Sequence, residues 1–493
     1  MGVVTKTPAP ADTSTSERAG TGPSSGLAGT PLADAGLPLG PLDGRYRRSV
    51  APLVEHLSEA ALNRERVRVE VEWVIHLSER AAVPGARRLT DDEKAALRAV
   101  VAGFDAADVA ELAELERRTV HDVKAVEYYL KRRMTGELAD LTELVHFCCT
   151  SEDVNNLAYA LMVRGAVQQV WLPSATALAD DVTALAVDLR EVPMLARTHG
   201  QPATPTTLGK ELAVLAQRLR RQLARVAGAE YLGKVNGATG TFAAHVAAVP
   251  STDWPAVSQT FVEGLGLTWN PLTTQIESHD WQAELYADVA RFNRVLHNLC
   301  TDVWTYISLG YFTQVLDSEG RGATGSSTMP HKVNPIRFEN AEANLEVSCA
   351  LLDVLASTLV TSRLQRDLTD SSMQRNIGTA FGHSLVALDN VRRGLAGLAA
   401  APAVMAADLD ANWEVLGEAV QSAMRAAGIA GTRGIDSPYE RLKELTRGHR
   451  VTGPMMREFI TGLGLPADAE QRLVALTPAT YTGLAAQLVD HLA

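Results

Sequence analysis

The sequence is poor in cysteine, in aromatic residues and in long apolar runs. Only four cysteines occur in 493 residues, and no Cys-x-x-Cys pair or Cys/His cluster accompanies them. A disulfide framework and a zinc site are therefore not expected, and a reducing cytoplasm is the expected location. Aromatic residues make up 5% of the chain. No stretch approaches the run of about eighteen apolar residues that a membrane-spanning helix needs.

Positive charge is also scarce. The chain has 46 Lys and Arg against 58 Asp and Glu, which gives a net charge of −12. Nucleic acids and anionic membranes attract proteins with surplus basic residues, so neither partner is expected. Hydrophobic residues make up 46% of the chain, enough for a large core. Because Ala and Leu are abundant and aromatics are few, the composition favours helices over sheets.

The first residues differ from all that follow. Gly, Pro, Ser, Thr and Ala account for 28 of the first 40 residues, and the first aromatic residue of the chain is Tyr46. Such a segment cannot bury enough apolar surface to offset the entropy lost on ordering. Residues 1–37 are therefore predicted to be a disordered N-terminal extension without a part in the fold.

The rest of the chain has a helical pattern. Its clearest stripe follows Pro205, ends before Gly228, and has apolar residues every three or four positions: Leu208, Leu212, Leu215, Leu219, Leu223 and Val226. A single apolar stripe on a long helix indicates packing in a bundle. Thr150 and Asp153 form a capping-box pattern that opens another long helix, with Pro173 as a kink or break. The sequence predicts an all-α protein built on long bundled helices.

A long irregular segment, residues 317–335, interrupts this pattern with the sequence DSEGRGATGSSTMPHKVNP. Connections in helical bundles usually have two to eight residues, and longer ones are normally functional. A solvated loop is the simpler interpretation of Gly- and Ser-rich sequence. Here, however, Lys332 and Asn334 could neutralise and orient a carboxylate, whereas Ser326 would need strong activation to act as a base.

Three other segments could carry chemistry. His199 lies among prolines and hydrogen-bonding residues in RTHGQPATP, although a lone histidine is more often packed or capping. His121 beside Asp122 is interpreted first as a helix cap. Ser371 and Arg375, four residues apart, would meet on one helical face and could bind a phosphate together, a pair that we call the phosphate grip. The alternative is a solvated charged face. No phosphate loop, dinucleotide fingerprint, nucleophile elbow or HExxH zinc motif occurs, which leaves proton transfer without a cofactor.

Together these segments resemble the fumarase/aspartase superfamily. The loop GSSTMPHKVNP, residues 325–335, is similar to its signature GSSxMPxKxNP, a highly specific match. The segments DGRY, HDVKAVEYYL, HFCCTSEDVNNL, RTHGQPATP, TTQIESHD, QRDLTDSSMQRN and PYERLKELTRG resemble the adenylosuccinate lyase branch in its longer bacterial form. This resemblance runs in order from about residue 38 to the end. It implies β-elimination of fumarate from adenylosuccinate, giving AMP, and from the succinyl-carboxamide ribotide SAICAR, giving AICAR, in purine nucleotide biosynthesis.

The resemblance also implies roles for single residues. His199 would be the general acid and Ser326 the general base, with Lys332 and Asn334 stabilising the carbanion. Val120 departs from the family, which usually has a polar residue before the histidine. The implied substrate-binding residues are Arg45, Tyr46, His121, Asp122, Thr150, Ser151, Gln275, Ser327, Lys332, Asn334, Asn340, Arg366, Ser371 and Arg375.

The same resemblance implies a three-domain fold and a homotetramer whose active sites are shared between subunits, with no metal or organic cofactor. Residues 38–140 would form an N-terminal helical domain, residues 141–393 a central long-helix bundle with the loop 317–335, and residues 394–493 a C-terminal helical domain. Two alternatives stay open: another lyase or cycloisomerase of the superfamily, and an inactive structural homologue.

Overall fold

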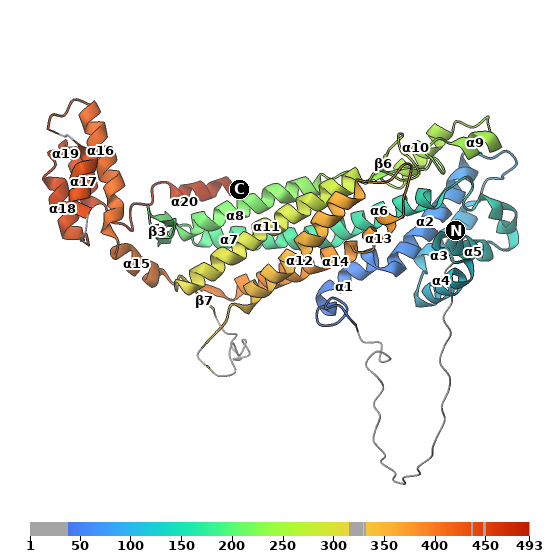
Figure 1. Cartoon of the computed structure of the whole chain (residues 1–493), viewed down its shortest axis with the longest axis horizontal. Coiled ribbons are helices and arrows are strands. Elements are labelled where there is room, and N and C mark those ends of the chain that lie inside the picture. The colour runs from blue at the N-terminus through green and yellow to red at the C-terminus, as the bar shows by residue number, and fades with distance from the viewer. Residues whose placement is uncertain (1–37, 315–328, 330–331, 435–436, 447–449, 493) are drawn as a thin grey trace, which may run out of the picture.

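The computed structural model describes residues 38–314, 329, 332–434, 437–446 and 450–492. The predicted extension, residues 1–37, lies outside the described residues. The chain is all-α, as expected from its composition and periodicity, and is elongated along a central bundle of long helices (Figure 1). Each end of this bundle carries a further group of helices.

The N-terminal end group packs on the long helix α2 and forms one hydrophobic core with the bundle. Fully buried Trp73, Val74 and Leu77 line the inner side of α2. The helices of this end are α1 (Arg47–Leu57), α2 (Glu59–Glu79), α3 (Asp91–Ala102), α4 (Ala106–Thr119), α5 (Asp122–Arg133), α9 (Ala243–Ala248) and α10 (Trp254–Gly264), with a 3-10 helix over Gly136–Leu144.

The central bundle contains the helices α6 (Ser151–Ala166), α7 (Leu172–Asp188), α8 (Leu208–Ala227), α11 (Asp280–Ser308), α12 (Ile336–Leu359) and α14 (Ile377–Ala396), with the short α13 (Thr369–Gln374) leading into α14. The stripe predicted for α8 is confirmed, because all six of its apolar residues are buried. Thr207 caps the start of α8 by accepting a hydrogen bond from the Lys210 N–H at 3.2 Å, and Gly228 follows its end.

Helices α6 and α7 continue one another through a π-helical turn, Val167–Trp171. Pro173 lies in the first turn of α7, where its missing N–H costs least, so the expected break is a local change of helix type. The helical run from Ser151 to Asp188 is about 55 Å long at 1.5 Å per residue. This run spans the bundle from one end group to the other.

The C-terminal end group has a separate hydrophobic cluster that includes Trp413, Leu416, Met424, Met456 and Ile460. Its helices are α15 (Pro402–Asp410), α16 (Gly417–Ile429), α17 (Pro438–Thr446), α18 (Gly453–Thr461) and α19 (Ala467–Ala475), with a 3-10 turn over Trp413–Leu416. The chain then returns to the bundle as α20 (Ala485–Leu488) and a 3-10 turn (Val489–Leu492) (Figure 1). An ion pair of 2.7 Å between Arg190 and Asp490 fixes this return.

The strands in the described part of the chain are two or three residues long and form isolated pairs. β1 (Pro193–Met194) pairs with β4 (Thr206–Thr207), β2 (Arg197–Thr198) with β3 (Gln201–Pro202), and β7 (Phe312–Gln314) with β8 (Leu398–Ala400), all antiparallel, whereas β5 (Leu232–Gly233) and β6 (Thr268–Trp269) are parallel. They fix turns between helices and do not build a layer.

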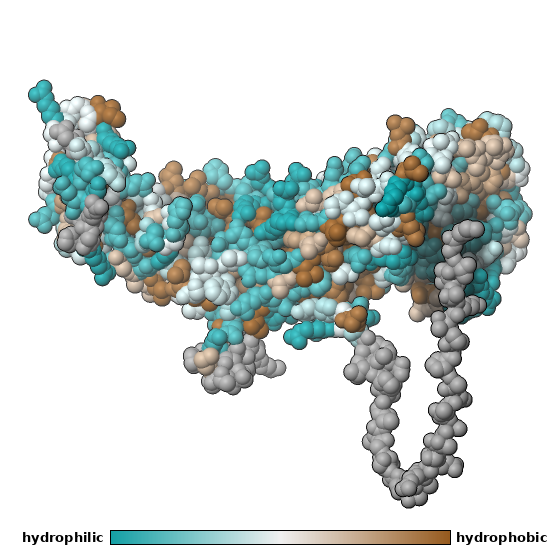
Figure 2. All heavy atoms as spheres, in the orientation of Figure 1, coloured by the Kyte–Doolittle hydropathy of each residue, from teal (hydrophilic) through white to brown (hydrophobic). Residues whose placement is uncertain are grey.

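Polar and apolar side chains share the surface of the bundle in the face that Figure 2 shows. Several large apolar residues of the bundle are exposed, among them Val214, Trp304, Val347 and Val354. None of the helices in the described part of the chain combines the length and apolarity that a membrane span requires.

Candidate active site

His121 and Asp122 begin α5 in the N-terminal end group. The predicted cap is present, because His121 Nδ1 accepts a hydrogen bond from the Lys124 N–H at 3.2 Å. Asp122 Oδ2 forms an ion pair with Nη2 of the buried Arg66 guanidinium at 2.7 Å. Burial alone would raise the pKa of the Asp122 carboxyl, but the charge and hydrogen bond of Arg66 outweigh it and lower this pKa. Asp122 is therefore held as an anion beside His121.

Thr150 and Ser151 lie where α6 begins, next to two buried acidic residues. Glu152 is 4% exposed, and its Oε1 forms an ion pair with Arg366 Nη2 at 2.8 Å. Asp153 accepts the Thr150 N–H at 2.8 Å, which closes the predicted capping box from the acidic side. The hydroxyl-bearing turn thus stands at a helix N-terminus, a place where backbone N–H groups favour anions.

Gln275, Ser371 and Arg375 join the same site from other segments of the chain. Arg366 Nη1 lies 3.5 Å from Gln275 Oε1, which brings residues 275 and 366 together. Arg375 Nη1 donates to Ser371 Oγ at 3.2 Å, the contact expected from their spacing. The same guanidinium lies 3.8 Å from Asp122 and 2.8 Å from Glu59.

Eight of the predicted site residues therefore gather at the N-terminal end of the bundle. Of these, Asp122, Arg366 and Arg375 are linked in one network of ion pairs and hydrogen bonds that runs through Arg66, Asn155 and Glu152. We call this group the N-terminal site cluster: His121, Asp122, Thr150, Ser151, Gln275, Arg366, Ser371 and Arg375.

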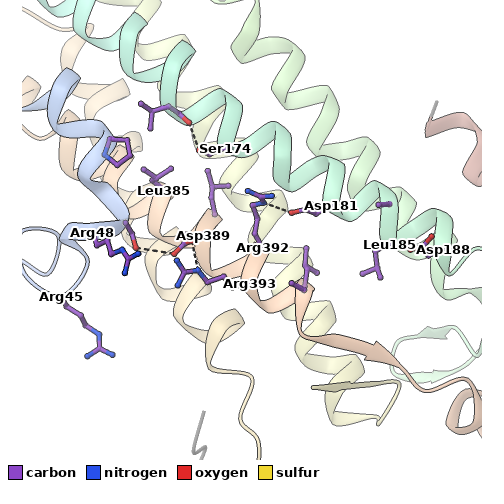
Figure 3. Close-up of a pocket in the computed structure, with 17 residues that line it drawn as sticks. Arg45, Arg48, Ser174, Asp181, Leu185, Asp188, Leu385, Asp389, Arg392 and Arg393 are labelled. Atoms are coloured by element: carbon purple, nitrogen blue, oxygen red, sulfur yellow. Dashed lines mark hydrogen bonds and ion pairs between the residues drawn. The ribbon is translucent and has the colours of Figure 1, made fainter. Parts of the chain in front are cut away.

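Tyr46 and Asn340 form a second, smaller contact between α1 and α12. The Asn340 amide donates to the Tyr46 hydroxyl at 2.9 Å. Arg45 is exposed and borders a groove of about 1040 Å³ between α1, α7 and α14 (Figure 3). Within this groove Arg392 pairs with Asp181 at 2.7 Å and Arg393 with Asp389 at 2.9 Å, whereas Arg45 extends away from them.

His199 lies at the opposite end of the bundle, on the tip of the β2–β3 hairpin. His199 (φ +54°) and Gly200 (φ +75°) form the two-residue turn of this hairpin. Both have the left-handed backbone conformation that such a turn requires. Arg197 anchors the hairpin, because its guanidinium contacts Asp408 at 2.6 Å and the Tyr311 hydroxyl at 2.8 Å. The His199 side chain is exposed at the tip of this anchored hairpin.

The predicted loop is described only in part. Ser326 and Ser327 lie outside the described residues, as does His331. Lys332 is exposed, and its N–H donates to the Met329 carbonyl at 3.1 Å. The Gln314 amide donates to the Val333 carbonyl at 2.9 Å, which ties this segment to β7, and the half-buried Asn334 follows.

One chain does not bring all these residues together. The N-terminal site cluster adjoins the start of α6, while the His199 hairpin follows the end of α7, and the helical run between them is about 55 Å long. Figure 1 shows β3 and α5 beside opposite ends of the central bundle. Groups of three or more His, Cys, Asp or Glu that could hold a metal ion are absent from the described residues.

Sequence reasoning missed several residues that support the site. The buried Arg66 links Asp122 to Asn155, whose Oδ1 accepts from Arg66 Nε at 2.9 Å. The buried Glu70 carboxylate contacts His146 Nδ1 at 2.6 Å and accepts the His146 N–H at 2.9 Å, just before Thr150. Lys234 pairs with Asp153. The HFCCTSEDVNN motif marked this segment, but the sequence holds no signal for such distant partners.

Comparison with known proteins gives two family matches along the chain. Residues 44–348 match the family described as "Lyase", and residues 362–482 match "Adenylosuccinate lyase C-terminal". Adenylosuccinate lyase of Escherichia coli K12 is 48% identical over 92% of this chain and 98% of its own length. The Haemophilus influenzae and Vibrio cholerae adenylosuccinate lyases are 47% and 46% identical over the same shares.

Solved structures agree with the fold. A fumarate lyase from Mesorhizobium sp. BNC1 superposes with a TM-score of 0.71 at 20% identity, covering 89% of this chain and 96% of its own. The 3-carboxy-cis,cis-muconate lactonizing enzyme from Pseudomonas putida gives 0.66 at 21%, covering 89% and 95%. The fold and the family matches define a lyase of the fumarase/aspartase superfamily. Within this superfamily, the chain belongs to the adenylosuccinate lyase family.

Proposed function

We propose that this protein cleaves adenylosuccinate to AMP and fumarate by β-elimination, and cleaves SAICAR to AICAR and fumarate in the same way. The observation that carries the proposal is the 48% identity to the E. coli adenylosuccinate lyase along 98% of that enzyme. The N-terminal site cluster fits such a substrate. Ser371 and Arg375 suit a phosphate group, and the Thr150–Ser151 turn suits a carboxylate.

The proposed chemistry needs a base and an acid on opposite sides of the substrate. The Ser326 oxygen, acting as the alkoxide, takes a proton from the succinyl carbon β to the nitrogen and becomes the neutral hydroxyl, and the electron pair left behind is delocalised into the adjacent carboxylate. Lys332 and Asn334 stabilise this charge. The carbon–nitrogen bond then breaks, the fumarate double bond forms, and His199 donates a proton to the departing nitrogen.

The remaining site residues would orient the substrate. His121 uses Nδ1 for its helix cap, so its Nε2 is the atom proposed to face the substrate. Arg45 and Tyr46 would hold the nucleotide end together with the phosphate grip. Residues proposed to orient the succinyl and base portions are Asp122, Gln275, Ser327, Asn340 and Arg366.

A homotetramer with shared active sites is part of this proposal. In one chain, the helical run of about 55 Å over Ser151–Asp188 separates the segment of His121 from that of His199, so a substrate that touches both histidines is proposed to lie between different copies. The apolar residues exposed along the bundle offer a surface for those copies. A cytoplasmic location is also proposed, with support from the four cysteines, all of which are free.

The test is the ultraviolet absorbance of purified protein mixed in turn with adenylosuccinate, argininosuccinate and malate. The proposal expects turnover of adenylosuccinate alone. Turnover of either other compound would favour a different lyase of the superfamily. An absence of turnover with all three, from folded protein, would favour an inactive homologue.

A further inference from the structure

A fully buried ion pair lies beneath the Thr150–Ser151 turn. Lys234 Nζ contacts Asp153 Oδ1 at 2.8 Å, and both side chains are 0% exposed. Among the ion pairs of the described residues, this is the one with both partners at zero exposure. Removing two charges from water is so costly that a buried ion pair adds little stability compared with apolar residues. Its contacts beneath the turn therefore indicate a role in positioning that turn rather than in stability.

Asp153 is the centre of a set of four hydrogen bonds. Oδ2 accepts the Thr150 N–H at 2.8 Å and the Gly237 N–H at 3.1 Å. Oδ1 accepts the Asn236 N–H at 3.0 Å in addition to the Lys234 ammonium. The carboxylate therefore joins the turn that begins α6 to the backbone of residues 236–237, more than eighty residues later.

The second segment, residues 234–240, leads to another part of the site. The carbonyl of Ala238 accepts a hydrogen bond from Gln275 Nε2 at 3.0 Å. The Asn236 amide donates to Thr273 Oγ1 at 2.7 Å. A side chain at Gly240 would meet the Thr273 carbonyl at 2.2 Å, so this backbone approach requires glycine. Lys234 and Asp153 thus connect the Thr150–Ser151 turn to Gln275.

Charge gives the pair a second role. Glu152 and Asp153 place two buried carboxylates in the first turn of α6, and each has its own cation, Arg366 and Lys234. Without Lys234 a net negative charge would lie beneath the turn proposed to bind the succinyl carboxylates. Like charges at short range in a buried site repel strongly.

We propose that Lys234 is a positioning residue, which neutralises Asp153 and fixes the Thr150–Ser151 turn for binding of the dicarboxylate portion of the substrate. This inference rests on the proposed function. Lys234 itself is covered by protein and acts through Asp153, not by contact with substrate. The phosphate grip of Ser371 and Arg375 is held by other contacts, so binding at that end should not depend on Lys234.

The experiment measures binding of fumarate and of AMP separately, by isothermal titration calorimetry of the full-length protein. In Lys234→Met the dissociation constant for fumarate should rise by about ten- to hundredfold, because a misplaced turn loses its carboxylate contacts. The constant for AMP should change less than about twofold. Lys94→Met, which removes an ion-paired lysine outside the site, is the matched control and should bind both as the wild type does.

A second variant keeps the test decisive if Lys234→Met does not fold. Asp153→Asn with Lys234→Met leaves no unpaired buried charge but removes one of the carboxylate oxygens, so fumarate binding alone should again weaken. Equal weakening of fumarate binding and AMP binding, or no weakening of either, would overturn the inference.

Wild-type protein that binds fumarate without turnover would instead refute the proposed function and leave Lys234 to be judged by binding. Wild-type protein that does not bind fumarate would refute both.

Discussion

Val120 is held in a backbone conformation that suits it poorly. It ends α4 with φ +52° and ψ +31°, and its side chain is 90% exposed. Left-handed backbone is unfavourable for a β-branched residue and is tolerated by asparagine. Val120→Asn should therefore raise the free energy of unfolding by about 1 kcal/mol, as measured by urea denaturation.

Val246, half exposed within α9, provides a matched control for this change. Val246→Asn lies on ordinary helical backbone and should change stability little. A destabilised Val120→Asn protein would show that the valine side chain makes a contact which outweighs the strain. Because Val120 directly precedes the proposed substrate-binding residue His121, such a contact would also help to position that histidine.

His146 gives the fold a pH dependence. Burial alone would lower the pKa of this imidazole, but the hydrogen bond and charge of Glu70 raise it. A raised pKa in the folded state stabilises the protein below the unfolded value of about 6.5, and this stabilisation is lost as pH rises through the folded pKa. The difference in unfolding free energy between wild type and Glu70→Gln should be largest near pH 6 and shrink toward alkaline pH.

Urea unfolding of both proteins from pH 6 to pH 8.5 measures this difference. Four other histidines have pKa values lowered chiefly by loss of contact with water and act in the opposite direction, but they are common to both proteins and cancel. These are His56, His76, His245 and His383. A difference that does not vary with pH would contradict the role of the Glu70–His146 pair.

Some single residues could be predicted from sequence and others could not. The His121 cap and the Thr150–Asp153 capping box depend on neighbours within three residues, so their sequence patterns determine them. Lys234 stands 81 residues from its partner Asp153, and a lone lysine normally indicates a solvated surface. Only the tertiary structure brings such partners together.

At the scale of elements, the long helices could be predicted because an apolar stripe specifies both a helix and its buried face. Helix α12 is different, since it is apolar on more than one side. Phe338, Leu345 and Leu352 are fully buried in the chain, whereas Val347 and Val354 on another side are each more than 40% exposed. A second apolar face on a bundle helix indicates a second packing surface, so another copy of the chain is the proposed cover for Val347 and Val354.

Val354→Arg should therefore weaken the assembly by placing a charge in an apolar contact between copies. Light scattering coupled to size-exclusion chromatography should show a shift from the proposed tetramer to smaller species. Val246→Arg, at an exposed valine of the N-terminal end group, should leave the mass unchanged. A Val354→Arg protein that keeps the wild-type mass at micromolar concentration would contradict the proposed interface.

At the scale of the whole molecule, the fold class followed from composition and periodicity, but the spacing of the site residues did not. Sequence order places His199 only 78 positions after His121, and nothing in that number indicates opposite ends of a bundle. The separation results from the uninterrupted run of α6 and α7, which carries the chain along the full bundle. A stripe of apolar residues also does not reveal how many copies pack against it.

This geometry makes one prediction that no single-chain site would share. His199→Ala and His121→Ala each remove one group from the proposed site and should lower turnover of adenylosuccinate by about two to four orders of magnitude. In the proposed tetramer each site takes the two histidines from different copies, so tetramers that contain both variants should include sites with both histidines intact. Mixing the two proteins, dissociating them in mild denaturant and re-annealing them should restore part of the activity. Each variant treated alone in the same way is the control and should stay inactive. Mixed tetramers, demonstrated by differently tagged chains, that show no recovery would mean that one copy supplies both histidines, against the distance between them in the structure.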